Sequence, residues 1–268
     1  MKNALLLYAT KLEDKLKITL TGAAELEEEP IHDFRVCTKK LHTVLSFLEY
    51  LSYHQISRRE LYKQFRVPFK KTGRIRELQI HIAQLSVLGE TTGHDTSFLA
   101  RKINYQIDRN RPFIREEIKK LKLRIPKFFS HLQGLIEQTC EGRSRHDAAM
   151  NYQLQLEKKI QKLVKGDNPD LLRIRKLFKQ KVYVFDSIQE SELLSFYKEF
   201  RAEWEILEST MGIWHDQVIL LQYLIRGLKW KRLNDEEYKI MMRLIAHLRS
   251  STSRMEKQLI RSIPKIPV

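Results

Sequence analysis

Apolar residues recur every three or four positions along almost the whole chain, and the residue types that interrupt helices are rare. Only nine glycines and seven prolines occur among the 268 residues. This spacing places apolar side chains on one face of an α-helix, whereas a strand would require alternation. The sequence therefore predicts an all-α protein.

Segments rich in Gly, Asp, Asn, Ser and Thr separate eight amphipathic stretches. Asp170 and Asp235 are predicted N-caps, because a carboxylate at that position accepts a hydrogen bond from the first helical turn. Pro68, Gly73 and Pro112 are expected to kink or split the long helices in which they lie. The predicted helices cover residues 3–20, 31–53, 57–88, 95–138, 145–165, 170–189, 192–230 and 235–262.

Short connections between long amphipathic helices favour antiparallel neighbours and bundle packing. Hydrophobic residues make up 42% of the chain, which is enough to form a packed core. Eight helices divide into four and four near residue 143. We therefore predict two helical halves, residues 1–143 and residues 144–268.

Two segments of the chain share a pattern that indicates an internal repeat. Residues 31–48 align with residues 171–188. Their basic residues coincide and most of their apolar positions meet apolar partners. In this alignment Arg35 falls on Arg175, and Lys39 falls on Lys179.

A second motif follows each of these segments. Residues 73–77 and residues 212–216 both begin with a glycine, have a basic residue three positions later and an acidic residue four positions later. The basic residue of this motif lies 41 positions after Arg35 in the first copy and 40 positions after Arg175 in the second. Two motifs at matched separation indicate a diverged duplication.

Basic side chains form stripes along the predicted helices. The stripe on helix 31–53 follows +3, +4, +3 spacing and lies beside the apolar face rather than opposite it. Helix 57–88 has a stripe with +4, +3, +4 spacing, and a third basic segment spans residues 173–181. A charged stripe that flanks the core more often lines a groove than one that points straight to solvent. The candidate anion-binding residues are His32, Arg35, Lys39, Lys40, His42, Arg59, Lys63, Arg66, Lys70, Arg76, Arg175, Lys176 and Lys179.

The net charge of +16 raises the electrostatic potential and attracts polyanions, which include nucleic acid, anionic lipid and polyphosphate. For any single Lys or Arg, a solvated helix face with salt bridges is the alternative, but nearby acids are scarce in the sequence of the stripes. His32 is either a phosphate ligand that binds more tightly when protonated or a histidine that orders the bundle.

Several functional classes lack support in the sequence. Cys37 and Cys140 have no metal-type spacing, so we expect core thiols in a reducing compartment. No stretch approaches the roughly 18 apolar residues that span a bilayer, and the N-terminus does not resemble a signal peptide. No catalytic or nucleotide-binding motif occurs, and His215 and Asp216 point about 100° apart on a helix. We expect a cytoplasmic protein without a metal, a cofactor or catalysis.

The two motifs resemble those of the CHAD domain, the conserved-histidine α-helical domain, from about residue 20 to the last helix. The family pattern is a His, basic residues at +3, +7, +8 and +10, and a Gly with an Arg-Asp pair some forty residues later, all repeated. The first copy here reads HDFRVCTKKLH and GRIRELQI, and the second reads LRIRKLFKQKVY and GIWHDQVI. This sequence departs from the pattern at His42, Glu77, Leu172 and Val182, so we expect the second-half site to be weaker.

The resemblance implies a pair of four-helix bundles related by pseudo-twofold symmetry. It also implies that the basic residues surround a central groove or pore and bind inorganic polyphosphate, in the cytoplasm and in association with polyphosphate granules. Nucleic-acid binding is an alternative that rests on charge alone. A scaffold or interaction protein is the other alternative, with anchors Trp204, Trp214 and Trp230, although tryptophans in such helices are more often core residues.

Overall fold

The computed structural model describes residues 1–140, 145–165, 169–188, 191–230 and 233–263, with the side chains of 145–146 and 191–204 left undescribed. All regular structure in these ranges is helical, which confirms the all-α class. Most of the predicted helix ends differ by only a few residues. The helices are α1 (Lys2–Ala24), α2 (Glu28–Leu51), α3 (Arg58–Thr92), α4 (Ser97–Thr139), α5 (Arg145–Val164), α6 (Leu171–Ile188), α7 (Ser191–Gly227) and α8 (Asp235–Ser262).

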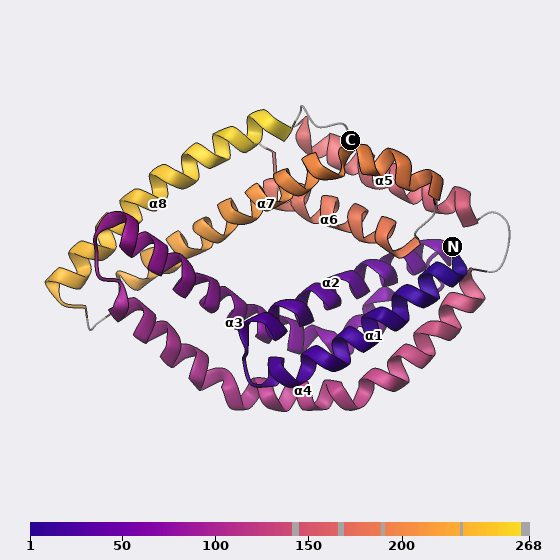
Figure 1. The fold of residues 1–268 in the computed structure, drawn as a ribbon, viewed down its shortest axis with the longest axis horizontal. Coiled ribbons are helices and arrows are strands. Elements are labelled where there is room, and N and C mark those ends of the chain that lie inside the picture. Colours follow the sequence, from indigo (N-terminus) through magenta and orange to yellow (C-terminus); the bar gives the residue numbers. More distant parts are fainter. Residues whose placement is uncertain (141–144, 166–168, 189–190, 231–232, 264–268) are drawn as a thin grey trace.

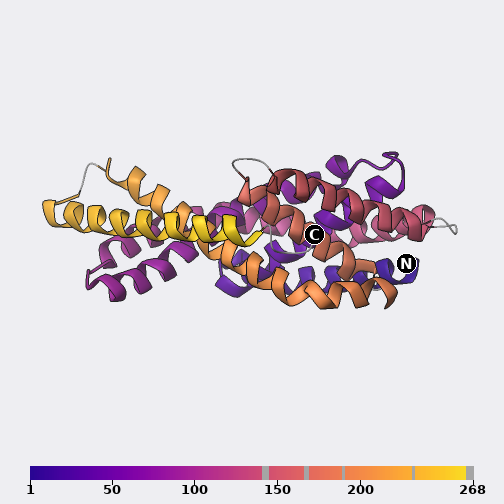
Figure 2. The same cartoon turned by 90° about the horizontal axis from the view of Figure 1, so that it is seen from above.

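The helices pack in pairs around an elongated ring (Figure 1). Helices α2, α3, α6 and α7 lie on its inner side, while α1, α4, α5 and α8 lie outside them. Figure 2 shows the same ring edge-on as a long, flat body. The two halves contact each other in two regions. In one, α2 packs against α6 and α5, and α1 packs against α6; in the other, α3 packs against α7. These two regions of contact close the ring.

A side chain caps the first turn of α6 and of α8 by accepting a hydrogen bond from a backbone N–H. The backbone N–H of Arg173 donates to the Asp170 carboxylate at 3.0 Å, which confirms the predicted cap. The predicted cap at Asp235 is wrong, because Asn234 takes that role one residue earlier. Its side chain accepts from the backbone N–H of Glu237 at 2.8 Å, and the Glu237 carboxylate accepts from the backbone N–H of Asn234 at 3.2 Å. This reciprocal pair satisfies two backbone donors that a bare helix end would leave unpaired.

The long helices α3 and α4 are not split. Pro68 lies inside α3, and Pro112 and Pro126 lie inside α4. Of the predicted kinking or splitting at Pro68, Gly73 and Pro112, the splitting is wrong, because tertiary packing outweighs the loss of one backbone hydrogen bond per proline. Helix α4 does bend where it follows the outside of the ring (Figure 1).

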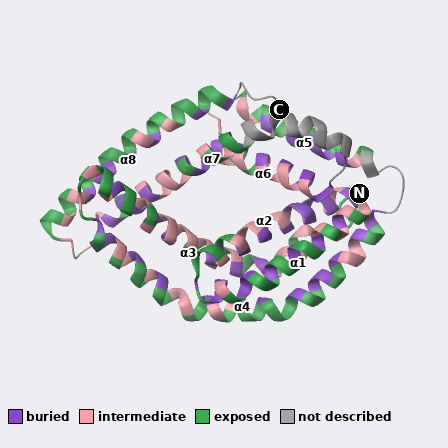
Figure 3. Cartoon of the chain, viewed as in Figure 1, coloured by how far each residue is buried: buried purple, intermediate pink, exposed green. Residues whose placement is uncertain are grey.

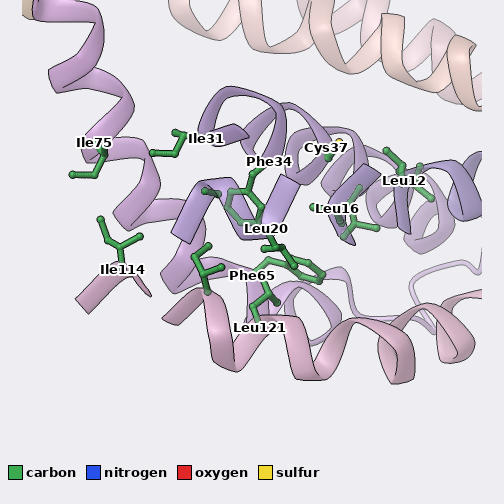
Figure 4. Packing of buried hydrophobic residues seen from close by; sticks show 14 of the residues in the cluster. Leu12, Leu16, Leu20, Ile31, Phe34, Cys37, Phe65, Ile75, Ile114 and Leu121 are labelled. Carbon is green, nitrogen blue, oxygen red and sulfur yellow. The ribbon is translucent and has the colours of Figure 1, made fainter. Parts of the chain in front are cut away.

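The larger hydrophobic core fills the first half of the chain. Phe34, Leu20, Phe65 and Leu121 come from four different helices and are buried together (Figure 4). A second cluster lies among α5, α6, α7 and α8 and contains Trp214. Figure 3 shows that much of α2, α3 and α6 is buried or half-buried, whereas α1, α4 and α8 have many exposed residues.

The larger core crosses residue 143. Val184 of α6, Leu224 of α7 and Leu244 of α8 all belong to it, together with the residues of α1 to α4. The division into residues 1–143 and 144–268 therefore does not separate two independent cores, and as a domain boundary it stays a prediction.

The remaining expectations about apolar residues concern cysteine and tryptophan. Cys37 and Cys140 are buried thiols, as predicted. Trp214 is buried, and Trp230 is partly buried against the larger core, so neither is a fully exposed anchor. The side chain of Trp204 lies outside the described residues. Within the ranges that the structure describes, no helix is both long enough and apolar enough to cross a membrane.

Candidate anion-binding site

Arg35 reaches from α2 to the backbone of α3. Its Nη1 donates to the carbonyl oxygen of Phe69 at 2.6 Å, and its guanidinium carbon lies 4.3 Å from the centre of the Phe69 ring. A Cβ atom on Gly73, one helical turn further, would lie only 2.6 Å from Arg35 Nη1. The glycine is therefore required for this close approach.

Arg175 makes the corresponding contact in the second half. Its Nε donates to the carbonyl oxygen of Glu208 at 3.4 Å, and a Cβ atom on Gly212 would lie 3.1 Å from its Nη2. Phe69 and Glu208 each precede the glycine of their motif by four residues. The same arrangement thus occurs in both halves, as a repeat predicts, although the duplication itself stays a prediction.

The charges of the two halves meet at Lys39 of α2. Its side chain is largely buried, and this burial, followed by the charges of Lys179, Arg35 and Arg175, lowers the pKa of Lys39 from 10.5 to about 8. The described part of the chain places no carboxylate within ion-pair distance of Lys39; the nearby carboxylate of Glu208 pairs with Lys179 and Arg175 instead. Cations from α2 and α6 therefore repel one another here without full compensation.

His32 and Arg76 extend this group of charges. Partial burial, and next the charge of Arg76, lower the pKa of His32, and Lys39 and Lys179 act in the same direction. Arg76 itself donates to the Glu28 carboxylate at 2.6 Å. We call the following six residues the central basic cluster: His32, Arg35, Lys39, Arg76, Arg175 and Lys179.

Lys176 lies beside the central basic cluster. It is exposed on α6, and its charge contributes to lowering the pKa of His215, after burial and Arg175. Nδ1 of His215 makes no hydrogen bond. Burial raises the pKa of the neighbouring Asp216 carboxyl. The two side chains are thus close to the cluster but are not joined as a hydrogen-bonded pair through that nitrogen.

Two carboxylates that the sequence did not reveal neutralise part of the cluster. Glu208 Oε1 lies 2.8 Å from both Arg175 Nη2 and Lys179 Nζ. Glu28 pairs with Arg76 across 48 positions of sequence. The expectation that compensating acids are scarce is therefore correct along the chain but wrong in space, because tertiary packing brings both acids in.

The stripe on α3 does not join the central basic cluster. The side chains of this stripe are exposed, and none of their charges is among the causes that shift the pKa of His32, Arg35 or Lys39. One of them lines a groove of about 580 Å³ between α3 and α4, beside Arg124 and Lys127. The α3 residues concerned are Arg59, Lys63, Arg66 and Lys70, of which Lys63 lines the groove.

The side chains of His42 and Lys40 contact aromatic rings of neighbouring helices and are not part of the central basic cluster. The ring of His42 packs edge-on against Tyr62 at 4.8 Å, and burial lowers its pKa, followed by the charge of Arg58. Lys40 Nζ lies 5.5 Å from the centre of the Tyr183 ring on α6. Both residues therefore contribute to packing between helices rather than to the cluster itself.

No protein-family profile matches this sequence, and no curated protein matches it. Two solved structures share its fold. The CHAD domain from the plant Ricinus communis superposes with a TM-score of 0.69 and 13% identity, covering 100% of this chain and 92% of that chain. PptA from Streptomyces chartreusis superposes with a TM-score of 0.58 and 12% identity, covering 99% of each chain. Over its whole length, this chain has the fold of a CHAD domain.

Proposed function

We propose that this chain binds inorganic polyphosphate at the central basic cluster and does not catalyse a reaction there. The observation that supports this most directly is Lys39, a largely buried cation beside Lys179, Arg35 and Arg175. Among the residues that the structure describes, no carboxylate lies within ion-pair distance of it. A bound anion would remove the repulsion among these charges and favour the protonated form of Lys39.

Polyphosphate suits this arrangement because it carries about one negative charge per phosphate along a flexible chain. Arg35 and Arg175 offer planar guanidinium groups for phosphate oxygens, and Lys39 and Lys179 offer point charges. A hydrogen bond to a charged group contributes about 1.5–3 kcal/mol, so a few such contacts give tight binding. The release of counterions from the polyanion adds to the affinity.

The CHAD fold and the matched motifs also support this proposal, because the resemblance to that family implies polyphosphate binding. The cytoplasmic location and the association with polyphosphate granules expected from the sequence are part of the same proposal. The absence of catalysis is proposed because the cluster is dominated by cations, whereas metal-dependent phosphoryl transfer requires grouped carboxylates to hold metal ions.

A competition titration tests the proposal. Labelled long-chain polyphosphate bound to the protein is challenged with unlabelled polyphosphate, single-stranded DNA, duplex DNA and orthophosphate at one salt concentration. Polyphosphate should displace the probe at much lower phosphate-equivalent concentration than either form of DNA. Equal displacement by DNA would reject polyphosphate as the preferred ligand.

Nucleic acid is the second candidate, and one observation favours it. Lys63, Arg124 and Lys127 are exposed around the groove between α3 and α4, and such cations can pair with the phosphates of a double helix. In that case, replacing Lys63 and Lys127 by Met would weaken DNA binding and leave polyphosphate binding intact.

The affinity for polyphosphate should fall as the pH rises through 8. In the unliganded protein, burial and neighbouring cations lower the pKa of Lys39 to about 8, so Lys39 loses its proton near that pH. The bound anion raises this pKa, and binding above pH 8 therefore requires proton uptake. Titrations at pH 7 and pH 9 in matched salt measure the effect. A Lys39→Met variant should lose the part of the pH dependence that lies near pH 8.

Gly73→Ala should weaken polyphosphate binding while changing stability little. Alanine favours the helix by about 1 kcal/mol, but its methyl group would displace the Arg35 guanidinium from the Phe69 carbonyl, a loss of about 0.5–1.5 kcal/mol. Thermal unfolding and titration measure both effects. Gly134→Ala is the matched control, because nothing lies within 4 Å of the added methyl group on α4. It should stabilise the protein and leave binding unchanged; equal binding by both variants would contradict the role of Arg35.

A further inference from the structure

The two halves differ in the side chain that lies next to the cluster arginine. In the first half this side chain is the ring of Phe69, 4.3 Å from the Arg35 guanidinium. In the second half it is the carboxylate of Glu208, 2.8 Å from Arg175 Nη2. Both residues occupy the fourth position before the motif glycine, and both accept the arginine hydrogen bond through their backbone carbonyl. The backbone contact is thus shared, and only the side-chain chemistry differs.

This difference makes the two halves unequal as anion sites. Arg35 contacts the Phe69 ring and its backbone carbonyl. In the described part of the chain no carboxylate lies within ion-pair distance of Arg35 or Lys39, although the charges of Glu77 and Glu208 act on them from further away. Arg175 and Lys179 share the single oxygen Glu208 Oε1. A phosphate oxygen that bridged Arg175 Nη2 and Lys179 Nζ in the same way would take the position that Glu208 Oε1 occupies.

The contacts of Glu208 are of a kind that a stronger anion can replace. Its side chain is 28% exposed, so the carboxylate has access to water when it leaves. Oε1 lies within ion-pair distance of both nitrogens, but neither contact has the geometry of a hydrogen bond. A phosphate group has more acceptor oxygens than one carboxylate oxygen and can bond both cations with better directions.

We propose that Glu208 is an internal competitor that determines which anions this site accepts. In the unliganded protein Glu208 pairs with Arg175 and Lys179. A polyphosphate chain binds first to Arg35 and Lys39, and its further phosphates then displace Glu208 from the two cations of the second half. A single phosphate must displace Glu208 from solution, at its own low concentration. The neighbouring phosphates of a bound chain are held close to Glu208 at high effective concentration and displace it more easily. Glu208 therefore selects long chains over short ones, an inference that rests on the proposed polyphosphate binding.

The test compares wild type with Glu208→Gln, which removes the competing charge and keeps the shape of the side chain. Affinities are measured by calorimetric titration for orthophosphate, triphosphate and long-chain polyphosphate. Glu116→Gln on α4 is the control, because it changes the net charge by the same amount at an exposed ion pair with Lys120. Glu208→Gln should bind triphosphate about tenfold more tightly than the control does, a difference that one added charge contact explains, with a smaller gain for long chains.

A second variant, Glu208→Phe, keeps the test valid if Glu208→Gln does not fold. Glu208 is the carboxylate that lies within ion-pair distance of Arg175 and Lys179 among the described residues, and Glu208→Gln therefore lowers stability. Glu208→Phe reproduces the first-half arrangement of Arg35 and Phe69, and it should show the same loss of preference for long chains. Circular dichroism verifies the fold of each variant.

The results separate this inference from the proposed function. Tight binding of long chains by wild type, with Glu208→Gln and Glu208→Phe no better for triphosphate than the control, overturns the role of Glu208 and leaves polyphosphate binding standing. If the Glu208 variants bind polyphosphate and wild type does not, Glu208 is a competitor that prevents wild type from binding, and the proposed function is overturned. No polyphosphate binding by any folded variant overturns both.

Discussion

Long-chain polyphosphate should bind about 100-fold more weakly at about 200 mM salt than at about 50 mM. At pH 7 the five lysine and arginine cations of the central basic cluster are Arg35, Lys39, Arg76, Arg175 and Lys179. If each releases counterions as it would from a single-stranded nucleic acid, the logarithm of the affinity falls against the logarithm of the salt concentration with a slope of about −3.5. Titration at four or more salt concentrations measures this slope.

The slope also reports which residues bind. A slope of about −1.5 would mean that only Arg35 and Lys39 contact phosphate, with Glu208 still paired to Arg175 and Lys179. A slope of about −6 would mean that the four exposed cations of α3 bind as well. Orthophosphate serves as the control and should give a slope near −1, because it makes too few contacts. A long-chain slope as shallow as that of orthophosphate would contradict multivalent binding.

Lys39→Met should weaken polyphosphate binding by about 10–100-fold and stabilise the unliganded protein by about 1–2 kcal/mol. The loss of affinity follows from one missing charge contact. The gain in stability follows from the low pKa of Lys39: the fold disfavours its charged form, so the penalty is fully present below pH 8 and disappears as the pH rises from about 8 toward 10.5. Thermal unfolding and titration of the same samples at pH 7 provide both numbers.

Lys119→Met is the matched control for this charge change, because Lys119 is exposed on α4, outside the cluster. It should alter neither affinity nor stability by more than a small amount. Equal losses of affinity in the two variants would mean that overall charge, and not the position of Lys39, determines binding. A destabilised Lys39→Met protein would mean that the ammonium group is satisfied in the fold.

The helices were predictable because the spacing of apolar residues within each segment is enough to indicate a helix, without knowledge of its neighbours in space. Phe34, Leu41 and Leu45 recur at helical spacing and are all fully buried in α2. The prolines of α3 and α4 show where local information fails. A proline weakens a helix in isolation, but Pro68 is buried among other helices and α3 continues through it.

The candidate site was predictable in part. Arg35 and Gly73 recur as Arg175 and Gly212, and the structure shows that each arginine packs on its glycine. The exclusion of the α3 stripe was not predictable, because helical spacing determines which residues share a face but not which neighbour that face meets. Glu208 could have been recognised by extending the aligned motifs four residues before each glycine, where it falls opposite Phe69.

The closure of the ring has a mechanical consequence for the cluster. Because α2 contacts α6 and α3 contacts α7, hinging the two halves apart to relieve the repulsion between Lys39 and Lys179 would require breaking one of these contacts. A hinged clamp would have to lose freedom of motion when it gripped an anion. Here the backbone that carries the cations is held before an anion arrives, so the proposed ligand would meet a largely preorganised site in which the Glu208 side chain is what has to move.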